Sequence, residues 1–189
     1  MDVKIENETI LSNDWYLLKK TTFQHRKNNG QWQTVTRETY DRGNGATILL
    51  YNLEKQTVVL TKQFRYPTYV NGNESGELIE AAAGLLDNVN PAERIRLEVE
   101  EETGYRIQNV TPVFEAFMSP GSVTERIYFF IAAYTETDRV SSGGGVADEG
   151  EDIEVLEIKF SQALNMIKTG EIRDGKTIML LQHVALHIF

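Results

Sequence analysis

The sequence predicts an α/β fold in which a mixed β-sheet is covered by helices. Strand patterns dominate the first third of the chain and return in its second half, and a single strong helix pattern, Pro91–Thr103, lies between them. Two more helix patterns close the chain, an order typical of a sheet with helices packed on it. The 189 residues suit one domain, or one domain with a small appended lobe.

The first elements form a predicted antiparallel hairpin. Trp15–Gln24 and Gln31–Tyr40 read as strands joined through Lys27-Asn28-Asn29-Gly30, and Asn-Gly favours the positive φ angles of a tight turn. The hairpin is long and polar, so it would make a poor core alone. We therefore expect residues 1–42 to form a lobe that pairs across a two-fold axis in a homodimer, with residues 43–189 as the main domain.

The strands after this hairpin are predicted where β-branched and aromatic residues cluster between turn residues. They are Ala46–Leu53, Thr57–Phe64, Val110–Met118, Arg126–Tyr134 and Ile153–Ile158. Leu78–Ala82 is a further short apolar run.

The helices have recognisable ends. Pro91 suits a first turn and Gly104 the position just after a helix. Two terminal helices are predicted at Ser161–Thr169, with Ser161 as N-cap, and at about Thr177–His187. The Gly-rich, acidic stretch Ser141–Asp152 has no periodicity and predicts a loop that is mobile without substrate.

Composition narrows the function classes. The net charge of −9 argues against a nucleic-acid partner, although small phosphorylated substrates remain compatible with a few basic residues and a cation. Cysteine is absent, which excludes a thiolate nucleophile and fits a reducing compartment. The N-terminus lacks a signal-peptide pattern and no apolar run is long enough to span a bilayer, so a cytoplasmic location without membrane attachment is expected.

The helix Pro91–Thr103 concentrates negative charge. Glu98, Glu101 and Glu102 are spaced three and four residues apart, which places them near one face of the helix. One interpretation is a solvated face balanced by Arg94 and Arg96. The other is a divalent cation, since carboxylate oxygens suit Mg²⁺ or Mn²⁺.

The pattern around this helix resembles the Nudix box, which combines a glycine, a loop and a glutamate-rich helix. Gly84 precedes the loop, and the helix carries Glu98-Val99, Glu101-Glu102 and then Gly104-Tyr105 at the family's spacing. Leu97 stands where the family usually has an arginine that orients a glutamate, although Arg94 and Arg96 are close.

The resemblance extends over nearly the whole chain. It points to the ADP-ribose pyrophosphatase-like branch of the Nudix hydrolases, and within it to the bacterial GDP-mannose pyrophosphatases. The stretches that carry it are Tyr40–Ala46, Gln63–Arg65, Asn71–Gly76, Met118–Gly121, Gly143–Val146 and Gly170–Thr177. It implies a Nudix α/β/α sandwich, dimeric through the N-terminal strands, that hydrolyses GDP-mannose to GMP and mannose 1-phosphate with Mg²⁺.

Two other functions stay open on the sequence alone. A broader nucleoside-diphosphate-sugar or ADP-ribose pyrophosphatase would use the same metal chemistry with a different base and sugar pocket. A non-catalytic sensor of nucleotide sugars would have no need for three glutamates on one helix.

The resemblance also assigns roles to individual residues. Mg²⁺, for which Mn²⁺ could substitute, would be bound by the carbonyl of Ala83 and by Glu98, Glu102 and Glu151. The catalytic carboxylates would be Glu151 as the base, with Glu149 in reserve because the register of the loop is open, and Glu101 orienting a water. The substrate would be contacted by Trp15, Thr36, Arg37, Glu38, Arg65, Glu125 and Lys176.

Two of these substrate contacts also have plain structural explanations. A tryptophan at the start of a strand is usually a core residue, which would leave Trp15 unable to stack on a base. Lys176, beside Asp174 and Gly175, could simply decorate a helix start.

Overall fold

The computed structural model describes residues 2–146, 148 and 150–189. They divide into two compact units. The first holds the described residues up to Asn44 together with Phe117–Ile127, and the second holds Gly45–Ala116 and Tyr128–Phe189.

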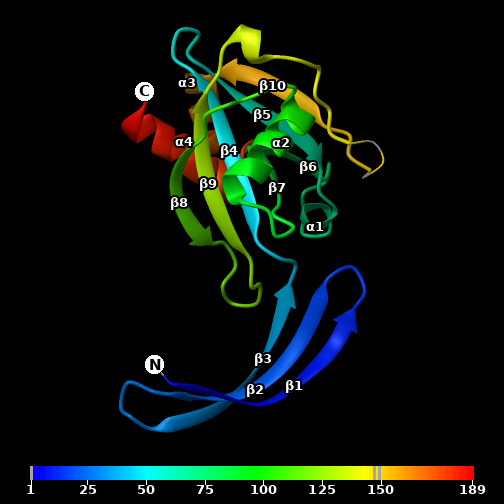
Figure 1. The fold of residues 1–189 in the computed structure, drawn as a ribbon, viewed down its shortest axis with the longest axis vertical. Coiled ribbons are helices and arrows are strands. Elements are labelled where there is room, and N and C mark those ends of the chain that lie inside the picture. Colours follow the sequence, from blue (N-terminus) through cyan, green and yellow to red (C-terminus); the bar gives the residue numbers. More distant parts are fainter. Residues whose placement is uncertain (1, 147, 149) are drawn as a thin grey trace. The chain divides into compact units, whose positions relative to one another are not determined.

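The first unit is a three-stranded antiparallel sheet (Figure 1). Its strands, in the order β1-β2-β3, are β1 (Val3–Asn13), β2 (Leu17–Arg26) and β3 (Trp32–Asp41). The predicted hairpin is confirmed as β2 and β3, and its turn is closed by the Gly30 N–H, which donates to the Lys27 carbonyl at 2.9 Å. Strand β1 was not predicted, because every one of its residues is exposed and it has no buried side to pattern.

A distant stretch of chain completes this unit. The Tyr40 N–H donates to the Ser122 carbonyl at 2.8 Å, and the Thr124 N–H donates to the Tyr40 carbonyl at 3.1 Å. The Thr124 hydroxyl also donates to Asp41 Oδ1 at 2.9 Å. The first unit is therefore built from the N-terminal strands and the connection that follows β8.

The second unit is built around a seven-stranded mixed sheet in the order β10-β5-β4-β9-β8, with β6 paired to β5 and β7 paired to β4. The strands are β4 (Gly45–Asn52), β5 (Thr57–Phe64), β6 (Glu77–Glu80), β7 (Ala82–Leu85), β8 (Thr111–Phe117), β9 (Arg126–Ala133) and β10 (Glu154–Lys159). The helices are α1 (Tyr66–Tyr69), α2 (Pro91–Thr103), α3 (Phe160–Thr169) and α4 (Gly175–His187), with a 3-10 turn η1 at Glu136–Asp138.

Helices cover both faces of this sheet. Helix α2 packs on β4 and β7, whereas α3 and α4 lie behind the strands in Figure 1. Ile48 and Val59 of the central strands join Ile95 and Val99 of α2 in one buried cluster. The central strands are buried along most of their length, as expected for strands covered on both sides. The predicted α/β class with a mixed sheet is confirmed.

Helix α2 has the predicted bounds. The Asn90 side chain caps it by accepting a hydrogen bond from the Ala92 N–H at 2.9 Å, and Pro91 occupies the first position, where its missing N–H costs nothing. Gly104 ends it with a φ of 79°, in the left-handed region that glycine tolerates. These local signals hold the acidic helix in a fixed place beside β7.

Other helix ends differ from prediction. Ser161 is not an N-cap: α3 begins one residue earlier, because Phe160 is buried and its N–H donates to the Gln56 carbonyl at 2.9 Å. Helix α4 begins at Gly175 because Asp174 caps it through the Thr177 N–H. Across the described residues, no helix has the length and apolar character needed to cross a membrane.

Candidate metal and phosphate site

Two of the three predicted glutamates of α2 are buried. Glu98 is 7% exposed and Glu102 is 2% exposed, although they lie one turn apart on the same helix face. Carboxylates are almost never buried without a partner. The solvated-face interpretation is therefore wrong for this pair. Glu101 differs from them, because its side chain is exposed.

The Glu102 carboxylate is buried among other negative charges. Its Oε2 is buried and has no hydrogen-bond partner among the residues that the structure describes. Burial raises the pKa of Glu102 well above its usual range, and the negative charges of Glu98 and Glu151 raise it further, while Arg65 opposes them. A buried carboxylate oxygen that lacks a donor, beside other carboxylates, is where a cation would relieve the repulsion.

The Glu98 carboxylate is held by its surroundings. A Cβ atom at position 84 would overlap this carboxylate, so only glycine lets the strand end approach it. Arg94, one turn earlier on α2, places Nη2 at 2.5 Å from Glu98 Oε1 and donates from Nε to the Leu85 carbonyl at 3.1 Å. Leu97 is exposed. Arg94 thus makes the orienting contact that Leu97 cannot make.

The Gly-rich loop packs on the C-terminal end of α2. The N–H groups of Gly144 and Gly145 donate to the carbonyls of Glu102 and Glu101, at 2.9 and 3.1 Å. Glu151 Oε2 accepts a hydrogen bond from the Val146 N–H at 2.9 Å, and a Cβ at position 145 would overlap this carboxylate. The loop thereby brings Glu151 into electrostatic contact with Glu102. Its mobility without substrate stays a prediction.

The second candidate base, Glu149, lies outside the described residues. Of the two loop carboxylates, only Glu151 can be placed relative to the helix.

The donor set fits a hard divalent cation. In the part of the chain that the structure describes, no three His, Asp or Glu side chains enclose an ion as they stand, and Glu98 is paired with Arg94. Yet Glu98, Glu102 and Glu151 supply carboxylate oxygens, and Glu102 Oε2 has no hydrogen-bond partner among the described residues. Ala83 precedes Gly84 on β7, so its carbonyl belongs to the strand that touches Glu98. Oxygen-only ligands of this kind suit Mg²⁺ or Mn²⁺.

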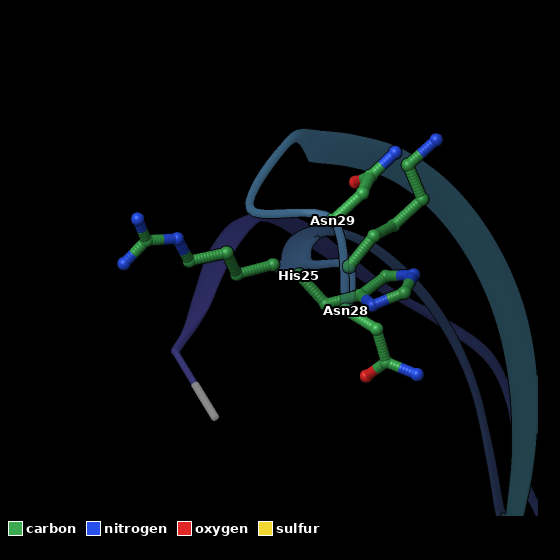
Figure 2. Close-up of a pocket in the computed structure, with 5 residues that line it drawn as sticks. His25, Asn28 and Asn29 are labelled. Atoms are coloured by element: carbon green, nitrogen blue, oxygen red, sulfur yellow. The ribbon is translucent and has the colours of Figure 1, made fainter.

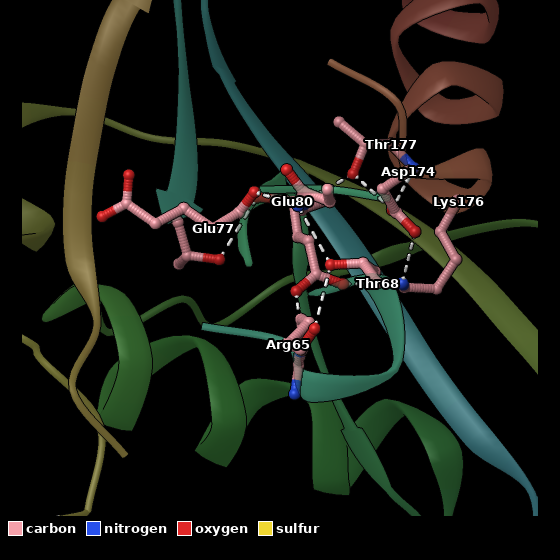
Figure 3. Close-up of polar contacts among 10 residues, drawn as sticks. Arg65, Thr68, Glu77, Glu80, Asp174, Lys176 and Thr177 are labelled. Atoms are coloured by element: carbon pink, nitrogen blue, oxygen red, sulfur yellow. Dashed lines mark hydrogen bonds and ion pairs between the residues drawn. The ribbon is translucent and has the colours of Figure 1, made fainter. Parts of the chain in front are cut away.

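A second polar cluster brings together two of the predicted substrate contacts, Arg65 and Lys176 (Figure 3). Arg65 follows β5 and donates from Nε to Glu80 Oε2 at 2.6 Å. Lys176, in the first turn of α4, donates from Nζ to Glu80 Oε1 at 3.1 Å and to Asp174 Oδ1 at 2.8 Å. The shared carboxylate of Glu80 therefore gathers both cations.

Sequence reasoning missed Glu80, which is 3% exposed at the end of β6. It lies inside the predicted apolar run Leu78–Ala82. The available signal was a lone carboxylate inside a buried strand, which requires cationic partners.

The remaining predicted substrate residues lie in the first unit. Trp15, between β1 and β2, is 83% exposed, so the expectation that it would be a core residue is wrong. The side chains of Arg37 and Glu38 on β3 are exposed, and the Thr36 hydroxyl pairs with that of Thr22 at 2.9 Å. Glu125 contacts Arg42, whose Nε lies 3.5 Å from its Oε1.

A hollow of about 510 Å³ at the turn between β2 and β3 does not belong to this chemistry (Figure 2). Its lining is a single run of neighbouring residues, His25 to Asn29, without a carboxylate. It reflects the shape of the turn and carries no functional assignment.

Comparisons with known proteins show which family the chain belongs to. A family model described as the GDP-mannose pyrophosphatase NudK N-terminal domain matches residues 2–40. GDP-mannose pyrophosphatase of Pectobacterium atrosepticum is 58% identical over 184 residues, covering 97% of this chain and 94% of its own. That of Citrobacter koseri is 57% identical over 182 residues, covering 96% and 94%.

The fold is also found among solved structures. The crystal structure of an ADP compounds hydrolase matches with a TM-score of 0.73 and 14% identity, covering 98% of this chain and 94% of that one. At this identity the match shows the fold alone, and it agrees with the predicted Nudix architecture. Because its relatives match almost from end to end, the chain belongs to the GDP-mannose pyrophosphatase family of Nudix hydrolases.

Proposed function

We propose that this chain hydrolyses the pyrophosphate bond of GDP-mannose to GMP and mannose 1-phosphate. The oxygen of water bonds to one phosphorus, the bridging P–O bond breaks, and the proton of the water passes to a carboxylate. The observation that carries the proposal is the buried Glu102 carboxylate, whose Oε2 has no donor within the described part of the chain and which faces the charges of Glu98 and Glu151. A fold that needed only stability would not retain such a group.

The residues present fit Mg²⁺, and Mn²⁺ is expected to substitute for it. The carbonyl of Ala83 and the carboxylates of Glu98, Glu102 and Glu151 would hold the ion. When bound, the ion neutralises pyrophosphate charge and lowers the pKa of a coordinated water.

Protein groups would do the remaining work. Glu151 would accept the proton of the attacking water, with Glu149 as the alternative base and Glu101 orienting a water from the exposed side of α2. Arg65 and Lys176 would bind phosphate oxygens, because they bring two cations to one buried carboxylate.

The first unit would complete the substrate pocket in a homodimer. Thr36, Arg37 and Glu38 would reach the partner's site, Trp15 would stack on guanine, and Glu125 would lie near the sugar or metal. The exposed indole of Trp15 supports this assignment, since a buried one could not stack on a ligand. We expect a cytoplasmic dimer. Sedimentation of an active monomer at micromolar concentration would contradict the dimer.

The direct test is a panel of GDP-mannose, other nucleoside-diphosphate sugars and ADP-ribose, each assayed with Mg²⁺ and with EDTA. The expected result is preferential, Mg²⁺-dependent turnover of GDP-mannose. Preference for ADP-ribose would support the broader pyrophosphatase, and binding without turnover would support a sensor.

A further inference from the structure

We propose that Glu80 is a positioning residue that holds the Arg65 guanidinium and the Lys176 ammonium in place for the pyrophosphate of the substrate. The inference rests on the proposed function, which assigns these two cations to the phosphates. It adds a residue that would bind neither the metal ion nor the substrate and would act through Arg65 and Lys176, which would bind the substrate.

The geometry divides the Glu80 carboxylate between two donors (Figure 3). Oε2 accepts from Arg65 Nε at 2.6 Å and Oε1 accepts from Lys176 Nζ at 3.1 Å. The cations come from the end of β5 and the start of α4, 15 and 96 residues away along the chain. Glu80 is only 3% exposed and the Lys176 side chain 15%, so the bond between them forms in a region of low dielectric, where it fixes geometry strongly. The Arg65 side chain is 40% exposed, so its guanidinium is fixed from the buried side and stays open to solvent.

The bonds leave donors for a ligand. The bond from Arg65 to Glu80 uses Nε, so the two terminal amino groups of the guanidinium are not consumed by it. The Lys176 ammonium has three N–H groups, of which Glu80 and Asp174 engage two. A guanidinium fixed through Nε keeps its plane, and that is the geometry needed for two-pronged contact with phosphate oxygens.

A second set of bonds fixes the cluster to the backbone. Asp174 Oδ2 accepts from both the N–H and the hydroxyl of Thr177, at 2.9 and 2.7 Å. The Thr177 oxygen in turn accepts from the N–H of Ala81, at 2.6 Å. The residue that follows Glu80 is therefore tied to the start of α4, the helix that carries Lys176.

The cluster is electrically linked to the metal site. Arg65 and Glu80 both influence the pKa of Glu102, in opposite directions. Burial alone would lower the pKa of Lys176, but Glu80 and Asp174 outweigh it and raise that pKa above its usual value. Lys176 thus stays charged at neutral pH, as a phosphate ligand must.

The simpler alternative is an ion pair that only stabilises the fold. Glu80→Gln separates the two, because it keeps the shape but turns one oxygen into an amino group that faces a cation instead of accepting from it. We expect the KM for GDP-mannose to rise roughly tenfold or more, with a smaller change in kcat, since one held cation loses its place. The dissociation constant for GDP in the presence of Mg²⁺, measured by calorimetry, should rise by a similar factor.

The matched control is Glu157→Gln. The Glu157 carboxylate lies on β10 and accepts hydrogen bonds from Lys55 and Tyr134, not from the two cations assigned to the phosphates. It should leave KM and GDP binding at wild-type values. The effect of Glu80→Gln should also shrink in a Lys176→Gln background, because the two residues act through one contact. If Glu80→Gln fails to fold, Glu80→Asp keeps the charge, shortens the reach by one methylene and should weaken GDP binding in the same way.

The outcomes are separable. A folded Glu80→Gln protein with wild-type KM and GDP affinity would overturn the positioning role while leaving the proposed function intact. A wild-type protein that does not turn over GDP-mannose would refute the proposed function, and GDP binding alone would then decide the role of Glu80.

Discussion

Replacing Glu102 with glutamine should stabilise the metal-free protein and lower its activity roughly a hundredfold or more. The wild-type carboxylate is 2% exposed, and its Oε2 finds no donor in the described part of the chain. An unsatisfied buried polar atom costs about 1–3 kcal/mol. Glutamine removes the charge and supplies an amino group that can donate to the neighbouring carboxylates of Glu98 and Glu151. For a chain of this size the melting temperature should rise by roughly 2–10 °C.

The same change should cost activity. A carboxylate that binds the cation and stabilises transition-state charge is worth roughly a hundredfold in rate. Differential scanning fluorimetry in EDTA and in Mg²⁺ measures the melting temperature of each protein. Mg²⁺ should raise the melting temperature of the wild type and have little effect on that of Glu102→Gln.

The control lies on the same helix. Glu100 is bonded to Arg106 Nε and Nη2 at 2.8 and 2.7 Å, on the exposed side of α2. Glu100→Gln should leave both the rate and the Mg²⁺-induced shift unchanged. The reasoning would be refuted if Glu102→Gln lowered the melting temperature in EDTA and kept wild-type turnover.

Three further predictions concern single positions. Gly84→Ala should displace the Glu98 carboxylate, because a Cβ there overlaps it; the Mg²⁺ concentration for half-maximal rate should then rise at least tenfold, and an unchanged value would contradict this. Glu151→Gln should lower kcat by roughly a hundredfold with little change in KM, since a base acts in the transition state; a mild effect would point to Glu149. Burial raises the pKa of Glu157, but the hydrogen bond from Tyr134 and the charge of Lys55 outweigh it and lower that pKa below its usual value; the Glu157 carboxylate should stabilise the fold by at most about 1 kcal/mol. That contribution is present above the usual pKa and lost as pH falls through the lowered one, so the melting temperatures of Glu157→Gln and wild type should differ at pH 7 and converge at pH values below the lowered pKa.

Local sequence signals made helix α2 predictable. Asn90, Pro91 and Gly104 mark its ends, and the structure uses each of them as a cap or terminator. The buried side of the same helix is less evident from sequence: three glutamates share similar spacing, yet Glu98 and Glu102 are buried and Glu101 is exposed. A rotation of part of a turn decides which carboxylate faces the sheet, and that rotation is set by packing.

Long-range partners could not be read from the chain. The residues that surround Glu80 come from β5 and α4, and their meeting depends on the sheet order. Strand β1 gave no signal because a strand exposed on both sides needs no alternation of apolar and polar residues. The sequence did not indicate that the N–H groups of Gly144 and Gly145 donate to carbonyls at the end of α2, because those partners lie about 40 residues earlier in the chain.

Hydrolysis of GDP-mannose in ¹⁸O-labelled water tests the central claim most directly. With Mg²⁺ present, the account predicts GMP and mannose 1-phosphate as products, one labelled oxygen on the phosphorus of one of them, and no reaction in EDTA. Release of GDP and free mannose would place the cleavage at the sugar carbon and contradict the account, as would equal turnover in the chelator.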